Sequence, residues 1–437
     1  MKKNYLNLVR LSILFITFAG SVNAQAISDA CTLQRQPEPQ GLSMSGADFD
    51  KYFRTLQREC ELTTRFRNAR NLLEGKYGFP IERLTEYQAL RYLRRVDYNN
   101  AIAMNVPVEY LYQINYPKDP IPMELRQRII WDNWIEGLTQ LAPARQKILN
   151  GGDFTVQDLQ NVHRGFYRKS TEISGSVPAA GDHAHEADPG HIKPGADNDN
   201  FWWVVKPPES YTVRAVVREI NETYRNLGLT DSSPDYMNVL QVKTAREYMD
   251  YLRNLASIAI PGRNQQLLKH VEEVQNRIYK GEFTTESELL FSGDSRANLK
   301  NLKSILSFVN KMFDQAQKNQ HMQWNGRLIT PAQVAYLAQK FYVGVHPFSE
   351  GNGRTSRFIQ ELVLTSFDMP HGSSGDLMDT DILMSFDQYY KLAIDSNINL
   401  ITAVEGCIKQ YETNGLTSLD SITRRAGSVD YGCRPLR

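Results

Sequence analysis

Residues 330–363 read TPAQVAYLAQKFYVGVHPFSEGNGRTSRFIQELV, and this stretch decides the fold. Thr330 before Pro331 is typical of a helix start, because threonine caps the first free amides and proline fits the first helical position. Apolar residues then recur at helical spacing up to Val345, and again over the last seven residues of the stretch, which predicts two buried helices. A polar turn with glycines and charges joins them. The sequence therefore predicts a core helix pair that presents one polar turn.

The turn carries residue types suited to phosphate. Gly351 and Gly353 let backbone N–H groups at a helix N-terminus approach an anion closely. Arg354 and Arg357 stand three residues apart, so they share a helix face and can hold the same polyphosphate. Glu350 is an oxygen ligand suited to Mg²⁺ that bridges phosphates.

His346 stands at the start of the turn, where Pro347 restricts the backbone. A histidine at this rim is placed to take a proton from an attacking hydroxyl. For any one of these residues alone, a solvated helix connection is the better interpretation. Their combination indicates a site.

Residues 346–357, HPFSEGNGRTSR, resemble the HxFx(D/E)GNGRxxR motif of the Fic family at every fixed position. A chance match to eight specified positions in this chain has a probability on the order of 10⁻⁸. The resemblance implies a mainly α protein with a Fic-type helical core, in which a typical member moves AMP from ATP onto a Ser, Thr or Tyr hydroxyl of a target protein. By position it implies His346 as general base, Phe348 as core anchor, Glu350 as Mg²⁺ ligand, Gly351, Asn352 and Gly353 as anion hole, and Arg354 and Arg357 as phosphate contacts.

Tyr389, Tyr390 and Asn397 resemble the family's contacts near the nucleotide base, with an aromatic pair on a helix surface as the alternative. Family members also hold the target with a β-hairpin flap ahead of the motif. Residues 171–207 and 283–292 both fit, and we favour the first for its turn and strand signals.

Many members carry an inhibitory [ST]xxxE[GN] helix. No exact copy occurs, and the nearest stretches are 132–137 (DNWIEG) and 70–75 (RNLLEG), so Glu136 and Glu74 are the candidate inhibitory residues. Farther along, the histidines and aspartate of 183–191 are better explained as a solvated loop than as a metal site.

The chain divides into five predicted parts. We expect a signal peptide (1–24), a mobile lead-in (25–46), an N-terminal helical arm (47–150), a Fic-like catalytic domain with insertions (151–410) and a C-terminal tail (411–437). The first part has basic residues, a short apolar run and small residues before Gln25, which predicts export through a Sec-type signal, with an uncleaved anchor as the alternative. No later segment has the run of about 18 apolar residues that a membrane span needs.

The balance of charged residues limits the classes of partner that the protein is expected to bind. The 437 residues include 50 Lys and Arg against 49 Asp and Glu, a formal charge of +1, which gives no support for a nucleic acid partner. The 4 cysteines, Cys31, Cys60, Cys407 and Cys433, form an even set that export would oxidise, and three pairings are possible. The pairing of neighbours in sequence would close each end of the chain; four buried thiols are the alternative.

These observations predict a secreted protein AMP transferase that modifies a hydroxyl-bearing protein of a host cell, because ATP is scarce in a periplasm-like space. A catalytically silent Fic fold used as a binding module, or a Fic enzyme with another nucleotide, is the alternative. The target and the oligomeric state stay open.

Overall fold

The structure is a computed structural model. It describes residues 27–37, 39, 42, 44–77, 136–166, 202–205, 214–215, 218, 240–258, 263–292, 298–345, 347–348, 352–370, 386–414, 422–424 and 431–433. The predicted signal peptide, 1–24, lies outside these residues, as does 183–191.

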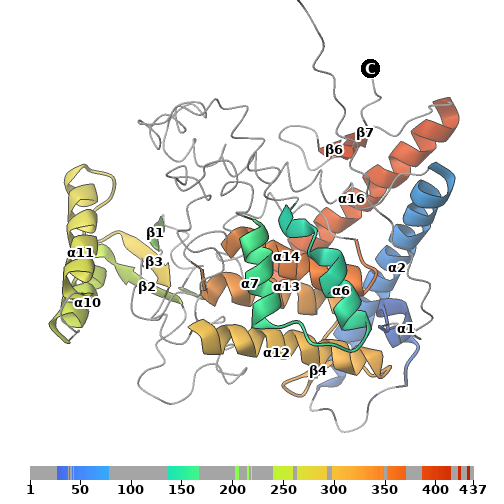
Figure 1. Cartoon of the computed structure of the whole chain (residues 1–437), viewed down its shortest axis with the longest axis horizontal. Helices are drawn as coiled ribbons and strands as arrows, with labels where there is room; N and C mark the ends of the chain where they lie inside the picture. Colours follow the sequence, from blue (N-terminus) through green and yellow to red (C-terminus); the bar gives the residue numbers. More distant parts are fainter. Residues whose placement is uncertain are drawn as a thin grey trace, which may run out of the picture.

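Helices dominate the described residues (Figure 1). The helices are α1 (Ala30–Gln34), α2 (Gly46–Tyr77), α6 (Leu141–Leu149), α7 (Val156–Gly165), α10 (Ala245–Ile258), α11 (Arg263–Tyr279), α12 (Asn298–Gln317), α13 (Pro331–Val345), α14 (Asn352–Ser366) and α16 (Phe386–Asn414). The strands are β1 (Trp202–Val205), β2 (Leu240–Thr244), β3 (Glu288–Ser292), β4 (Gln323–Trp324), β5 (Arg327–Leu328), β6 (Ile422–Arg424) and β7 (Tyr431–Cys433). The prediction of a mainly α protein is confirmed.

The described strands form three small antiparallel sheets, ordered β1-β3-β2, β4-β5 and β6-β7. β1 belongs to the favoured flap segment, 171–207, and β3 to the other, 283–292. Trp203 and Val242 both pair with Leu290, so β3 is the central strand. The two segments that we treated as alternatives therefore contribute neighbouring strands of one sheet.

A separate small core lies beside this sheet. It joins α10 and α11 to Phe283 and Leu289, at the left of Figure 1. The main core is formed around α13 and α14, with α6, α7, α12 and α16 packed against them. Nearly every residue of α13 is buried, as expected for a helix that is apolar on all sides.

α2 and α16 run parallel and side by side, at the right of Figure 1. A row of ion pairs joins them, with every cation on α2 and every anion on α16: Lys51–Asp387, Arg58–Asp395, Arg65–Glu405 and Lys76–Glu412. These side chains are 38% to 76% exposed, so each pair contributes less than about 1 kcal/mol to stability. The one-sided charge pattern favours the pairing of α2 with α16 over the pairing of either helix with a copy of itself.

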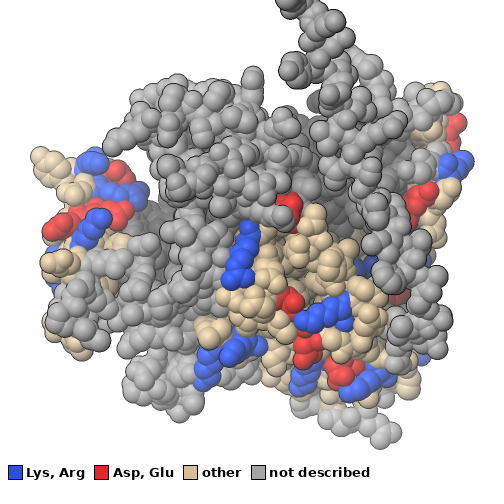
Figure 2. All heavy atoms as spheres, viewed as in Figure 1, with Lys and Arg blue, Asp and Glu red and all other residues tan. Residues whose placement is uncertain are grey.

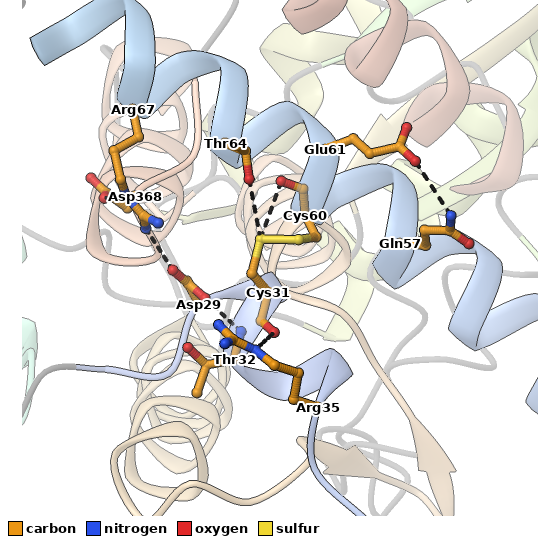
Figure 3. Close-up of a disulfide and its surroundings, with 10 residues drawn as sticks. All are labelled: Asp29, Cys31, Thr32, Arg35, Gln57, Cys60, Glu61, Thr64, Arg67 and Asp368. Carbon is orange, nitrogen blue, oxygen red and sulfur yellow. Dashed lines mark hydrogen bonds and ion pairs between the residues drawn. A yellow bond between two sulfur atoms is a disulfide. The ribbon is translucent and has the colours of Figure 1, made fainter.

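The expectation of a mobile lead-in over 25–46 is wrong for its middle part. Ala30–Gln34 form α1, with Asp29 as N-cap and a disulfide from Cys31 to Cys60 of α2 (Figure 3). Leu33 is buried in the main core, because the apolar residues of this short helix fit against α2. The predicted pairing of Cys31 with Cys60 is confirmed.

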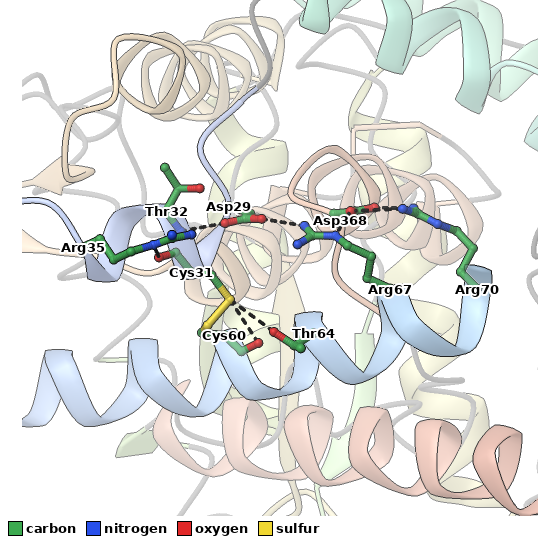
Figure 4. Close-up of polar contacts among 9 residues, drawn as sticks. All are labelled: Asp29, Cys31, Thr32, Arg35, Cys60, Thr64, Arg67, Arg70 and Asp368. Atoms are coloured by element: carbon green, nitrogen blue, oxygen red, sulfur yellow. Dashed lines mark hydrogen bonds and ion pairs between the residues drawn. A yellow bond between two sulfur atoms is a disulfide. The ribbon is translucent and has the colours of Figure 1, made fainter. Parts of the chain in front are cut away.

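A charged network continues from this helix to the end of α14 (Figure 4). Arg67 of α2 donates to Asp29 (2.5 Å) and to Asp368 (2.9 Å), and Arg70 pairs with Asp368 as well. The pKa values of both carboxyl groups are lowered; burial opposes this shift, but bonds to the arginines outweigh it. The lead-in, α2 and the end of α14 are thus joined.

Basic and acidic side chains of the described residues are intermixed on the face in Figure 2. None of the helices in the described ranges combines the length and apolar character needed to cross a membrane. The predicted tail, 411–437, is partly ordered, since α16 continues to Asn414 and β6 pairs with β7.

We predict that the second disulfide joins Cys407 to Cys433. Cys407 is disulfide-bonded, and β7, which ends at Cys433, lies against α16. Peptide mapping without reductant should recover this linked pair together with Cys31–Cys60. Alkylation of Cys433 in the native, unreduced protein would show that the pairing is wrong.

Candidate functional site

The polar turn between α13 and α14 is closed by its own asparagine. The Asn352 side chain accepts from the Phe348 amide (3.0 Å) and donates to the Phe348 carbonyl (2.7 Å). Both residues are buried, so this pair of bonds fixes the start of α14. Phe348 is the core anchor that the motif implies. His346, Glu350 and Gly351, the predicted base, Mg²⁺ ligand and first anion-hole glycine, lie outside the described residues.

α7 supports the turn from one side. Its N-terminus is set by a capping box of Thr155 and Asp158, and its other end brings His163 and Phe166 to the motif. The His163 ring stacks on Phe348, with centroids 3.9 Å apart. This histidine is fully buried.

Arg354 is held by α7. Its Nη1 donates to the Phe166 carbonyl (3.3 Å), and its guanidinium lies over the Phe166 ring, 5.8 Å from the centroid. Arg357, one turn later, donates from Nη1 to the Tyr389 hydroxyl (2.9 Å) and to Gln360 (3.4 Å). The two arginines are 6% and 5% exposed, so two cations are concentrated in the first turns of a buried helix. Such an arrangement stabilises a bound anion.

A carboxyl group stands one turn beyond Arg357. Burial raises the pKa of Glu361 to about 8, and the Arg357 charge only partly opposes this. Its Oε2 is buried, and no residue in the described part of the chain forms a hydrogen bond with it. The motif helix therefore carries a second ionisable group that the sequence analysis did not identify, although the four-residue spacing from Arg357 would have indicated it.

Tyr389, Tyr390 and Asn397 are the three residues predicted to lie near the nucleotide base. All three lie near the motif helix, and each is hydrogen-bonded to another side chain. Tyr389 is buried and accepts from Arg357. Asn397 is buried and donates to the Tyr336 hydroxyl (2.7 Å). Tyr390 is half-buried and donates to Glu59 of α2 (2.6 Å). The structure thus connects these residues to the motif through Arg357 and to the N-terminal arm through Glu59.

Glu59 is a residue that the sequence analysis missed. It is 1% exposed, accepts bonds from Thr330, Ala332 and Tyr390, and its carboxyl occupies the start of α13. Burial raises its pKa to about 7, although these three bonds lower it. The sequence did contain a signal: Glu59 stands three residues from both Leu56 and Leu62, so helical spacing places it on the apolar face of α2.

Of the two candidate inhibitory glutamates, Glu136 is the one beside the motif. The carbonyl of Glu136 and the Cα of Gly137 pack against Gly165, at the end of α7. Glu74 is exposed near the end of α2. Residues 132–135 lie outside the described part of the chain, so inhibition by Glu136 stays a prediction.

The described donors fit an anion better than a cation. Among the described residues no group of three or more histidine, cysteine or acidic side chains could hold a metal ion. The start of α14 has Gly353, two arginines and an N-terminus, which suit phosphate oxygens. A Mg²⁺ ion would need Glu350.

The comparison with known families agrees with the motif. Residues 263–364, from the start of α11 into α14, match the model described as Fic/DOC family. This part of the chain is therefore a Fic/DOC domain. Members of the family commonly transfer AMP to proteins, with ATP and usually Mg²⁺. No curated protein matches the chain significantly.

We predict that Gly137→Ala destabilises the protein by about 1–3 kcal/mol, because the new methyl group would overlap the buried Phe166 ring. Gly75→Ala is the matched control. It stands at the same place in the other inhibitory-like stretch, and its Cβ would meet nothing within 4 Å. Urea unfolding measures both variants; equal stability of the two would contradict the packing described.

Proposed function

We propose that the chain is a protein AMP transferase that moves AMP from ATP to a Ser, Thr or Tyr hydroxyl of a target protein. One observation carries the proposal: the complete motif places two buried arginines in the first turns of α14, beside an N-terminus that suits phosphate. The family match over 263–364 supports it.

The described residues would bind and orient ATP. Arg354 is oriented by the Phe166 carbonyl and ring, and Arg357 by the Tyr389 hydroxyl, so both guanidinium groups are held before a ligand arrives. Such preorganisation stabilises charge that develops on phosphate in the transition state. The Asn352 bonds to Phe348 hold the turn on which these groups depend.

The reaction would be a single displacement at the α-phosphorus. His346 would take the hydroxyl proton, the hydroxyl oxygen would bond to the α-phosphorus, and the bond to the bridging oxygen would break, releasing pyrophosphate. Mg²⁺, held by Glu350, would neutralise the phosphate charge. The anion hole of Gly351, Asn352 and Gly353 would receive the phosphate oxygens.

We further propose that the protein acts outside the producing cell, on a host-cell protein. This rests on residues 1–24, whose pattern is that of a signal peptide. A host cytosol supplies ATP, which an oxidising space outside the cell does not. A mature N-terminus at Gln25, determined from the culture medium, would support export; an intact Met1 on cell-associated protein would contradict it.

The mass of the group transferred to the target gives the most direct test of the proposed function. Mature protein, ATP, Mg²⁺ and a host-cell lysate should give target proteins whose intact mass rises by one AMP. An adduct of phosphate or phosphocholine size would reject AMP transfer. No adduct with any nucleotide would indicate the binding module.

We predict that His346→Ala lowers the rate of AMP transfer by about 10²–10⁴, the usual contribution of a general base. ATP affinity should change little, because the arginines remain. Arg357→Ala should instead weaken ATP binding, because a guanidinium contact to phosphate is lost. Labelling with α-phosphate-labelled ATP measures the rate, and calorimetry the affinity. Unchanged labelling by a folded His346→Ala protein would disprove the assigned base.

A further inference from the structure

We propose that Glu59 of α2 is a positioning residue for this site: it fixes the start of α13 and, through a trio of tyrosines, the orientation of Arg357. The proposal rests on the proposed function for its effect on ATP. Its structural part stands on contacts between three helices.

The Glu59 carboxylate joins α2, α13 and α16. One oxygen accepts from the Thr330 and Tyr390 hydroxyls, the latter at 2.6 Å, and the other accepts from the Ala332 amide at 3.1 Å. Thr330 and Ala332 flank the first residue of α13, so the carboxylate also meets the positive end of the helix dipole. One buried side chain thus sets where α13 begins and where α16 lies beside it.

α2 also contacts the end of α14, the second helix of the α13–α14 pair. Arg67 and Arg70 bind Asp368, two residues past the end of α14. The start of α13 and the end of α14 are both opposite the motif turn. α2 therefore holds the end of the α13–α14 pair that lies opposite the motif turn, where the proposed chemistry takes place. Glu59 makes the buried contact of this attachment.

A continuous path runs from Glu59 to the arginine. The Tyr390 ring contacts Tyr336 edge-on at 6.1 Å, and Tyr336 contacts Tyr389 in the same way at 5.8 Å. The Tyr389 hydroxyl then accepts from Arg357. Releasing Tyr390 would loosen this stack and with it the guanidinium orientation.

The ionisation of Glu59 should make the stability of the protein depend on pH. The ionisable groups that face it are the hydroxyls of Tyr52, Tyr336 and Tyr390, and Tyr52 in turn bonds His321. Among the described residues no cation pairs with Glu59. Burial raises its pKa to about 7, so as pH falls through neutral one carboxyl oxygen gains a proton and donates a bond, while the remaining lone pairs still accept.

Glu59 contributes more to the stability of the folded protein at low pH than at high pH. The folded protein binds the Glu59 proton more tightly than the unfolded chain, whose carboxyl has the ordinary pKa of 4.5. This group's contribution is therefore fully present below about pH 4.5 and is lost as pH rises through about 7. A glutamine at this position has no such dependence.

The experiment compares Glu59→Ala and Glu59→Gln with Glu61→Ala, a control that removes an exposed carboxylate two residues away. Calorimetry measures ATP affinity, and urea unfolding measures stability, each at about pH 6 and about pH 8. Amide hydrogen exchange reports on the first turn of α13 and on Tyr389.

We expect Glu59→Ala to weaken ATP binding about tenfold, and Glu59→Gln to restore most of it. The stability difference between wild type and Glu59→Gln should shift in favour of wild type from about pH 8 to about pH 6. A folded Glu59→Ala protein with wild-type ATP affinity would overturn the proposal.

Two further outcomes are decisive. If the wild type binds no ATP, the proposed function fails, and exchange decides the positioning: faster exchange at Ala332 and Tyr389 in Glu59→Ala supports it, and unchanged exchange overturns it. If Glu59→Ala does not fold, Tyr390→Phe, which removes one of the three bonds to Glu59, decides: faster exchange at Tyr389 supports the proposal, and unchanged exchange overturns it.

Discussion

A carboxylate at the start of a buried helix is the contact on which the site depends. α13 is surrounded by protein, so water cannot satisfy the N–H groups of its first turn. Glu59 and Thr330 satisfy them from within the core. Because an unsatisfied buried amide is costly, α13 can be placed at the centre of the core only with α2 beside it. α2, from the N-terminal arm, is thereby part of the helical fold that carries the motif rather than an appendage.

The elements close to the motif could be predicted from sequence because their signals are local. Thr330 and Pro331 mark the start of α13, as the structure confirms. The start of α7 is capped in the same local way, by Thr155 and Asp158. Helical spacing and capping act within a few residues, so one sequence contains all the information needed. The motif likewise identified a Fic/DOC domain before any contact was known.

The contacts that orient the site could not be predicted, since they join residues that are far apart in sequence. Glu59 meets Tyr390, and Arg354 meets Phe166, across separations of 331 and 188 residues. No local pattern specifies such pairs. The lead-in was misjudged for the same reason, because its composition suggests a loop while its few apolar residues find a core provided by α2. His163 also became interpretable only beside Phe348.

The parallel pairing of α2 with α16 has a consequence for how the chain is made. Lys51 and Asp387 are 336 residues apart, and the other three pairs of the row are similarly distant. A polypeptide emerging from its ribosome therefore cannot finish folding until nearly its whole length has been synthesised, and such non-local topologies fold slowly. Until α16 has been made, the face of α2 that will receive it stays exposed.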